Sequence, residues 1–285
     1  VGLGGRLDAV NIFDSACAAI TSVDMDHMDY LGDSREQIGF EKAGIFRAAR
    51  SAVCGEPDLP QSVAAHAAEV GANLRLISRD FGYDNVEPHQ WRFWSGTGQR
   101  MTLPYPALRG AYQLGNAAVC LAVLEQLRVQ LPVAHDDIRR GLLAAVVTGR
   151  FQVLPGWPQR IFDVAHNPHA ARALAANLRA MPPTGKTIAV FAMLRDKDIA
   201  GVVRAMKDRI DLWLIAGIDQ ARGASADEVL GVLAQEGLAK KAEVFASVAD
   251  AYRHACDKAA EDDKILVFGS FHTVAEAMTS VKAGG

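Results

Sequence analysis

From Gly149 onward, short apolar segments alternate with helical segments, and this alternation limits the fold more than any other feature of the sequence. Near-continuous apolar strands, each followed by a helix, are typical of a parallel sheet that helices cover on both faces. The sequence therefore predicts an α/β fold for this half. We expect strands at residues 160–165, 187–193, 211–216, 242–245 and 264–268, and helices at residues 169–181, 199–208, 226–235 and 248–259.

Residues 1–148 follow a less regular pattern. Ser34, with Gln37 three residues later, has the spacing of a helix N-cap and its capping-box partner. Gly71 ends an alanine-rich helical segment as a C-cap would. Residues 10–23 and 74–78 have the apolar character of strands.

The middle of this half contains Trp91-Arg92-Phe93-Trp94 followed by two glycines, a pattern that predicts a small antiparallel hairpin. The change of pattern near residue 148 predicts two domains, residues 1–148 and 149–285, and 285 residues suit about two domains. We expect helices in the first domain at residues 34–46, 60–71, 113–130 and 137–147.

The overall composition excludes several classes of partner. A formal net charge of −3 gives no basic surface for nucleic acid. The apolar runs are shorter than the ~20 residues that cross a bilayer, and no secretory signal is apparent. We therefore expect no nucleic-acid partner, no membrane association and a cytoplasmic location. The cysteines are too scattered for a zinc site or a disulfide framework, and we expect buried small hydrophobes at Cys17, Cys54, Cys120 and Cys256.

The chain begins Val1-Gly2-Leu3-Gly4-Gly5, without an initiator Met, in a segment typical of the end of a buried strand. We therefore expect a fragment, a processed product or a truncated product.

In a parallel α/β sheet, ligands bind where the carboxyl ends of strands continue into loops. Residues 160–165 are followed by His166-Asn167-Pro168, in which Asn167 suits a helix N-cap and Pro168 the first helical turn. Capping does not explain Asp163 within the strand or His166 at its end. An acid there could accept a hydrogen bond from a ribose hydroxyl, and a histidine could reach a phosphate or an adenine.

Two further loops follow predicted strands. Lys197 lies in a charged loop that is either a solvated loop with an Asp cap or a contact for an anionic substrate. In the loop after residues 264–268, Thr273 and Glu276 have capping-box spacing. That leaves Gly269 and Ser270 to present backbone and hydroxyl donors to a carboxylate.

The loop from Asp24 to Gly32 concentrates carboxylates around His27. It is either a polar turn or a magnesium site, since hard oxygen ligands favour Mg²⁺. The glycines at the start of the chain do not make a dinucleotide fingerprint, because Leu7 stands where the third glycine belongs. No G-x-x-x-x-G-K-[ST] phosphate loop occurs in the 285 residues.

Together the motifs resemble the Mur ligase superfamily and, within it, the bifunctional folylpolyglutamate synthase/dihydrofolate synthases. The matching segments occur in the family's order and span nearly the whole chain. They are Gly2–Ala9, Asp26–Gly32, Glu41–Ile45, Gly115–Ala118, Gly149–Phe151, Asp163–Pro168 and Gly269–Thr273. The resemblance implies the remainder of a central ATPase domain, with a mostly parallel sheet and a small antiparallel hairpin, and a C-terminal Rossmann-like domain.

The resemblance also implies roles for residues that composition could not assign. His27 would bind magnesium, and Lys42 would be carbamylated and support the metal site. Asn116 would contact adenine, Arg150 would reach the ATP phosphates, and Asp163 and His166 would complete the nucleotide site. Residues Asp8 and Ala9 would belong to the pterin-side pocket, and Lys197 and Ser270 would hold the incoming glutamate or the transferred phosphate.

The implied reaction is ATP-dependent ligation of L-glutamate to dihydropteroate and to folates. ATP phosphorylates the substrate carboxylate, the amine of glutamate attacks the acyl phosphate, and phosphate leaves. The implied cofactors are ATP and Mg²⁺, and a monovalent cation such as K⁺ is a further candidate. We expect a monomer. The family's phosphate loop and a metal-binding Glu would lie upstream of Val1, so we expect the chain alone to be catalytically incompetent.

Three other functions fit the sequence less well. A cell-wall Mur ligase shares the chemistry, but the Leu-Gly-Gly-Arg-Leu-Asp and Gly-Ser-Phe-His segments favour the folate branch. The chain could instead be a non-catalytic fragment that binds a nucleotide or glutamate. An NAD-dependent dehydrogenase comes last, because its glycine fingerprint is absent.

Overall fold

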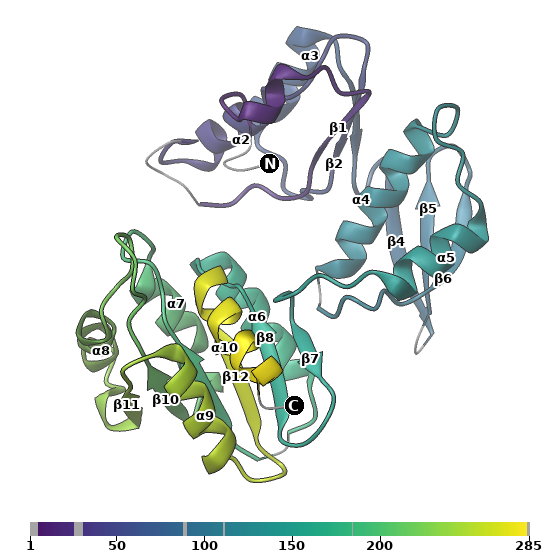
Figure 1. Cartoon of the computed structure of the whole chain (residues 1–285). Coiled ribbons are helices and arrows are strands. Elements are labelled where there is room, and N and C mark those ends of the chain that lie inside the picture. Colours follow the sequence, from purple (N-terminus) through teal and green to yellow (C-terminus); the bar gives the residue numbers. More distant parts are fainter. Residues whose placement is uncertain (1–4, 26–30, 88–89, 111, 184, 284–285) are drawn as a thin grey trace. The chain divides into compact units, whose positions relative to one another are not determined.

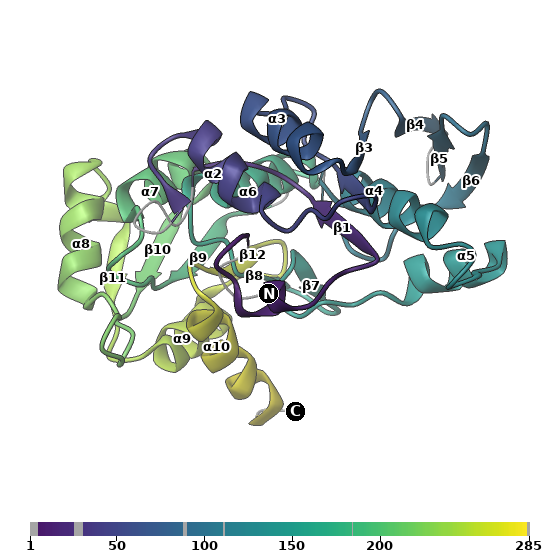
Figure 2. The same cartoon turned by 90° about the horizontal axis from the view of Figure 1, so that it is seen from above.

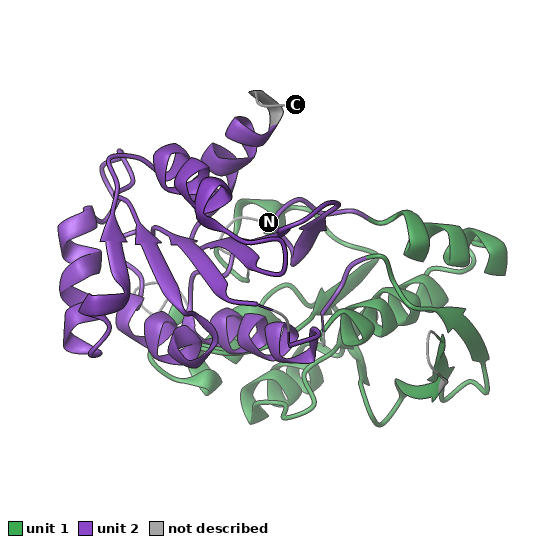
Figure 3. Ribbon diagram, turned by 90° about the horizontal axis from the view of Figure 1, so that it is seen from below, with its two compact units in different colours: residues 1–107, 112–145 green, residues 108–111, 146–285 purple. Residues whose placement is uncertain are grey.

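The structure, a computed structural model, describes residues 5–25, 31–87, 90–110, 112–183 and 185–283. The chain divides into two compact units (Figure 3). Unit 1 comprises residues 1–107 and 112–145, and unit 2 comprises residues 108–111 and 146–285. Each of the four clusters of buried apolar residues lies within one unit, so each unit has its own core.

Unit 2 contains a six-stranded sheet in the order β11-β10-β9-β12-β8-β7 (Figure 1). Every neighbouring pair is parallel except the β7–β8 pair at one edge. The predicted parallel sheet is therefore confirmed, and the short antiparallel strand β7 was not predicted. The strands are β7 (Gln152–Leu154), β8 (Gln159–Asp163), β9 (Thr187–Phe191), β10 (Leu212–Ile215), β11 (Ala242–Val244) and β12 (Lys264–Phe268).

Helices cover both faces of this sheet (Figure 2). Residues along each strand alternate between the two cores: on β9, Ala189 and Phe191 pack against one helical layer, and Ile188 and Val190 against the other. The first layer is α6 (Pro168–Ala180), α7 (Ile199–Met206) and α8 (Ala226–Gln235), and the second is α9 (Val248–Lys258) and α10 (Phe271–Ala283). The 3₁₀ turns of this unit are η2 (Lys207–Arg209) and η3 (Ala239–Lys241).

Unit 1 combines a parallel sheet, β1-β2-β3, with an antiparallel sheet, β4-β5-β6. The predicted antiparallel hairpin is confirmed by β5 and β6. The third strand of this sheet, β4, was not predicted. The elements are η1 (Ala9–Ile12), β1 (Cys17–Ile20), α2 (Arg35–Ala43), β2 (Ser51–Cys54), α3 (Gln61–Val70), β3 (Asn73–Leu76), β4 (Phe81–Glu87), β5 (Gln90–Ser95), β6 (Arg100–Pro104), α4 (Gln113–Gln126) and α5 (His135–Ala144).

Two of the predicted helix boundaries in unit 1, at Ser34 and Gly71, have their expected causes. The Ser34 hydroxyl accepts the main-chain N–H of Gln37 at 3.3 Å and begins α2. The Gln37 side chain accepts from Asp33 N rather than from Ser34 N, so the reciprocal half of the capping box is displaced by one residue. Gly71 ends α3 in the left-handed region, at φ +70°.

Two predictions in unit 1 are wrong, one of them in part. The strand character predicted for residues 10–23 is confirmed only at β1, because the Asp8 carboxylate accepts from Val10 N and begins the 3₁₀ turn η1, which leaves Ile12 and Phe13 exposed. Cys120 is exposed on α4 rather than buried, because it lies on the side of the helix opposite the core residues Ala117, Ala118 and Leu121. Within the described residues, no helix has both the length and the apolar character that would be needed to span a membrane.

Candidate functional site

Arg150 lies in a short segment that is bonded to the end of β8 on both sides. The carbonyl of Gly149 accepts from Val164 N at 2.8 Å, and the N–H of Phe151 donates to Asp163 Oδ2 at 2.8 Å. Both flanking residues have positive φ, +72° for Gly149 and +42° for Phe151, and a Cβ on Gly149 would lie 2.7 Å from a Val164 methyl. A non-glycine residue holds such a conformation only where its surroundings fix it, so the path of the chain through Arg150 is tightly determined.

Asp163 connects this segment to the loop that follows β8. Its second oxygen, Oδ1, accepts from Ala165 N at 2.8 Å, so each carboxylate oxygen accepts one main-chain N–H. Burial raises the pKa of Asp163, against the lowering effects of the two N–H donors and of the nearby Arg150 and His166. Asp163, which was predicted to accept a hydrogen bond from a ribose hydroxyl, thus has both carboxylate oxygens bonded to main-chain N–H groups of neighbouring segments.

His166, which follows this loop, has one ring nitrogen committed. Its Nδ1 lies 2.8 Å from the carbonyl oxygen of Val164, which can only accept, so Nδ1 carries a proton. In the neutral imidazole, Nε2 is then the acceptor. The ring centroid lies 6.1 Å from that of Phe271, whose other neighbour is the Arg150 guanidinium at 5.7 Å from the ring centroid. The structure therefore brings Arg150, Asp163 and His166 together and adds Phe271.

The loop after β12 differs from the prediction. Helix α10 begins at Phe271, so Thr273 lies inside the helix and is not an N-cap. Its hydroxyl donates to the carbonyl of Ala192 at 2.8 Å, and Glu276 accepts from Ala249 N, because both side chains face neighbouring elements. Ser270 instead precedes the helix: it is buried, and its Oγ accepts from His272 N at 3.2 Å.

Lys197 lies half-buried in the loop between β9 and α7. Neighbouring charges in this loop are paired: Arg195 binds Glu228 through two contacts of 2.7 and 3.1 Å, and Arg222 binds Asp196. Asp198 caps α7 by accepting from Gly201 N at 2.8 Å, as the helix-capping interpretation of this loop predicts. The loop is thus ordered by contacts within unit 2, at the same carboxyl edge of the sheet as His166.

In unit 1, Asp8 and Lys42 line one pocket of about 170 Å³, together with Thr21 and Ser22 at the end of β1. Asp8 is buried and Lys42 half-buried. Ala9, the first residue of η1, follows the pocket residue Asp8 directly in the sequence. Two segments distant in the sequence, both part of the family resemblance, therefore meet at one cavity.

Arg6 and Glu41 hold these two segments together. The guanidinium donates to both carboxylate oxygens of Glu41, at 3.0 and 3.2 Å, and Arg6 N donates to the carbonyl of Glu41 at 2.7 Å. Asn11 adds a bond from its side-chain amide to the carbonyl of Gly44 at 3.2 Å. Because both the side chain and the main chain of Arg6 contact α2, the pocket wall that carries Asp8 is fixed against the helix that carries Lys42.

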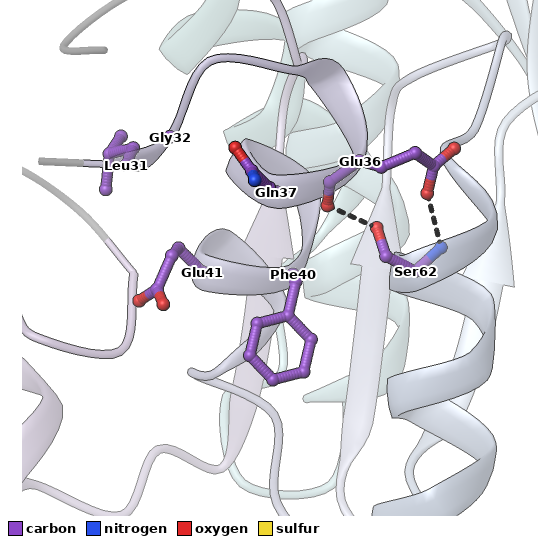
Figure 4. A pocket seen from close by; sticks show the side chains of 7 residues that line it. All are labelled: Leu31, Gly32, Glu36, Gln37, Phe40, Glu41 and Ser62. Atoms are coloured by element: carbon purple, nitrogen blue, oxygen red, sulfur yellow. Dashed lines mark hydrogen bonds between the residues drawn. The ribbon is translucent and has the colours of Figure 1, made fainter. Parts of the chain in front are cut away.

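A second, larger pocket of about 500 Å³ is lined by residues of α2, of the segment before it and of α3 (Figure 4). The Glu36 carboxylate accepts from the N–H groups of Gln61 and Ser62, at 3.0 and 2.8 Å, and so caps α3, where Pro60 has no side-chain cap to offer. These bonds lower the pKa of Glu36. The residues that line this second pocket are Leu31, Gly32, Glu36, Gln37, Phe40, Glu41 and Ser62.

The structure says less about the residues that were predicted to bind the metal ion and the adenine. His27 lies outside the described residues. Among the residues that are described, no three His, Cys, Asp or Glu side chains gather as a metal site. Asn116 is exposed near the start of α4, and its side-chain amide donates to Gln113 Oε1 at 3.3 Å.

The chain is similar to known proteins over nearly its whole length. Residues 149–271 match the Mur ligase, glutamate ligase domain family. The chain is 44% identical over 283 residues to the dihydrofolate synthase/folylpolyglutamate synthase of Escherichia coli strain K12, covering 99% of this chain and 64% of that protein. The chain belongs to the Mur ligase family. A Haemophilus influenzae protein of the same description is 39% identical over 295 residues, covering 97% of this chain and 66% of that protein.

Solved structures of other Mur ligase family members have the same fold. E. coli FolC in complex with ADP, without folate substrate, matches with a TM-score of 0.92 and 42% identity, covering 100% of this chain and 66% of that one. A bifunctional synthase with Mn, AMPPNP and L-glutamate bound matches with a TM-score of 0.88 and 46% identity, covering 99% of this chain and 66% of that one. This chain thus spans slightly less than two thirds of the length of these relatives.

Proposed function

We propose that this chain is part of an ATP-dependent ligase that joins L-glutamate to dihydropteroate and to tetrahydrofolate in folate biosynthesis. The observation that carries the proposal is the similarity to dihydrofolate synthase/folylpolyglutamate synthases over 99% of the chain. The gathering of Arg150, Asp163 and His166 at the carboxyl edge of a parallel sheet supports it, because that edge is where such sheets bind ligands.

The proposed reaction has two steps. The γ-phosphoryl group of ATP passes to a carboxylate oxygen of the pterin substrate, which releases ADP and gives an acyl phosphate. The glutamate nitrogen then attacks the acyl carbon, the C–O bond to phosphate breaks, and the nitrogen loses a proton. We propose that the exposed Arg150 guanidinium and His166 Nε2 contact the phosphate oxygens, where positive charge and hydrogen bonds stabilise phosphoryl transfer.

We propose the remaining site residues in two groups. Asp8 and Ala9 would border the pterin substrate and Asn116 the adenine, whereas Lys197 and Ser270 would contact glutamate or the transferred phosphate. Since the Ser270 hydroxyl already accepts from His272 N, it would act on a ligand as a donor.

We propose a divalent cation at His27 and Lys42, where bound Mg²⁺ would neutralise charge on the phosphates. The Lys42 ammonium cannot ligate a metal, but a carbamate on its nitrogen would place oxygen donors in the pocket beside Asp8. The relative with Mn and AMPPNP bound supports ATP and a divalent ion as the ligands.

We also propose a division of labour within the chain. Residues 1–148 would be the C-terminal part of an ATP-binding domain, and residues 149–285 the domain that binds glutamate, in line with the family match to residues 149–271. Because the 285 residues contain no phosphate-loop motif, we expect no ligase turnover from this chain by itself.

A chimera tests the proposed function. In it, this chain replaces the matching segment of the E. coli relative, and ADP release is measured with ATP, dihydropteroate and L-glutamate. We expect turnover that requires both substrates. The Arg150→Ala substitution should lower kcat about 10²- to 10³-fold, whereas Arg179→Ala, which removes an exposed arginine from α6, should not change it. A folded chimera without glutamate-dependent turnover would refute the proposal.

A further inference from the structure

We propose that Phe271 is a positioning residue, whose ring holds the Arg150 guanidinium and the His166 imidazole as one anion-binding unit. This inference deepens the proposed function and rests on it. The sequence analysis gave no role to Phe271, which lies in the Gly269–Thr273 segment of the family resemblance, between the buried Ser270 and a histidine at the start of α10.

The ring of Phe271 lies largely outside the core of unit 2. It is 56% exposed, so burial in the core does not account for its place. Its two polar neighbours come from different segments: Arg150 Cζ is 5.7 Å from the ring centroid, and the His166 ring centroid is 6.1 Å away at an interplanar angle of 45°. The electron-rich face of an aromatic ring attracts a guanidinium, so the contact favours one orientation of a long side chain.

The main chain around these two polar residues is fixed separately. Asp163 accepts the N–H that follows Arg150 and the N–H that precedes His166, and the carbonyl before Arg150 accepts from Val164 N. The Cα atoms of Arg150 and His166 are therefore held by Asp163, whereas the Arg150 side chain is exposed and has many rotamers. The His166 ring is already oriented by its Nδ1 bond to the carbonyl of Val164, and Phe271 supplies the missing restraint on the Arg150 side chain.

Two groups that share one ring are presented together. An anion with several oxygens, such as a pyrophosphate, can then contact the guanidinium and the imidazole without ordering the arginine side chain on binding. Because Phe271 orders the Arg150 side chain before the ligand arrives, less side-chain entropy is lost on binding. The anion should therefore bind more tightly than it would without the Phe271 ring.

The first test is NMR spectroscopy of the 285-residue chain labelled at His and Arg. The ring of Phe271 displaces the signals of nearby protons, so Phe271→Leu should move the His166 ring signals and the Arg150 Nε–H signal. Phe271→Tyr keeps the ring and should restore them. The amide spectrum of each variant checks that the fold is retained.

The chain offers a matched control. Phe245 and His254 form another Phe–His pair in unit 2, with centroids 5.0 Å apart at 44°, beside the opposite edge strand β11. Phe245→Leu should move the His254 signals and leave those of His166 and Arg150 in place. If Phe271→Leu leaves the His166 and Arg150 signals where the wild-type protein has them, the proposal is wrong.

The second test is titration with inorganic pyrophosphate. We expect Phe271→Leu to bind it roughly two- to fivefold more weakly than the wild-type chain, as one exposed cation–π contact implies, with Phe271→Tyr restoring the affinity. Equal affinity of Phe271→Leu and wild type, with weaker binding by Arg150→Ala, would overturn the positioning role. Absence of pyrophosphate binding by the wild-type chain would count against the proposed function, and the NMR signals would then decide the inference alone.

Discussion

Asp163 shows how one side chain can organise a site without needing to touch a ligand. Its two oxygens accept main-chain N–H groups on either side of β8's end, one beside Arg150 and one beside His166. The sequence indicated that an acid within an apolar strand needs an explanation. It could not give this one, because the partner N–H of Phe151 belongs to a segment whose positive φ is not evident from its residues.

The Asp163→Asn substitution tests this role. The amide keeps the size of the carboxylate but has only one oxygen, so one of the two main-chain N–H groups would face an NH₂ group. An unsatisfied, largely buried N–H costs about 1–3 kcal/mol. We expect the free energy of unfolding, measured by urea denaturation, to fall by that amount, and an unchanged value would contradict the assigned hydrogen bonds.

Gly269 is a second residue of structural importance, because its backbone conformation leaves no place for a side chain. Its φ is +113°, and a Cβ there would lie 2.4 Å from the carbonyl oxygen of Ala192 on the neighbouring strand's loop. Gly269→Ala should therefore destabilise unit 2 by about 1–3 kcal/mol or more. The control is Gly231→Ala in α8, where a Cβ meets nothing within 4 Å and should stabilise the helix by about 0.5–1 kcal/mol. Thermal unfolding of both variants should show shifts of opposite sign.

At the scale of the elements, α8 begins with two acidic residues, Asp227 and Glu228, in its first turn. Glu228 forms a capping box with Ser225 and a two-contact pair with Arg195, which together lower its pKa to about 2, the Arg195 bond first. A carboxyl whose pKa is lowered on folding stabilises the fold above its ordinary pKa of 4.5, and the effect is lost as the pH falls toward 2.

We therefore expect the stability difference between wild type and Glu228→Gln to shrink as the pH falls from about 5 to 2. Hydrogen exchange of the first amides of α8 measures this locally. Because Glu228 is on the surface, the difference should also decrease in high salt. A difference that is constant over this pH range would exclude the carboxylate as its cause.

The regular elements of unit 2 were the most predictable, and the reason is burial. The core strands β9 and β12 are apolar on both faces, which makes them visible as continuous runs. The short edge strand β7 has three half-buried residues and no such signal. The start of α10 was predicted three residues too late, because Thr273 has N-cap chemistry but bonds to Ala192 across the sheet.

The candidate site was predictable where one loop carries it, and not where distant segments meet. The loop holding Asp163 and His166 was expected from its place after a strand. The contact of Phe271 with Arg150 depends on the insertion of β12 beside β8, which no local pattern in the sequence specifies. The same holds for Arg6 and Glu41, whose pairing joins the two segments that carry Asp8 and Lys42 of the pocket.

At the scale of the whole molecule, the separate cores make unit 2 a candidate for independent folding. Both of its apolar clusters consist of residues after position 150. We expect residues 146–285, expressed alone, to unfold in a single cooperative transition with coincident fluorescence and circular dichroism midpoints. A fragment without a cooperative transition would show that unit 2 depends on the rest of the chain.

The place of β12 in this sheet has a consequence for biosynthesis. Strand β12 is synthesised after β8 and β9, the first two strands of the parallel set, and it pairs with β8 on one side and with β9 on the other. Until β12 emerges, β8 and β9 have no partner between them, and their unpaired edges are exposed. The nascent chain therefore cannot close this sheet in the order of translation, so a stalled or interrupted synthesis would leave an aggregation-prone intermediate for chaperones to protect.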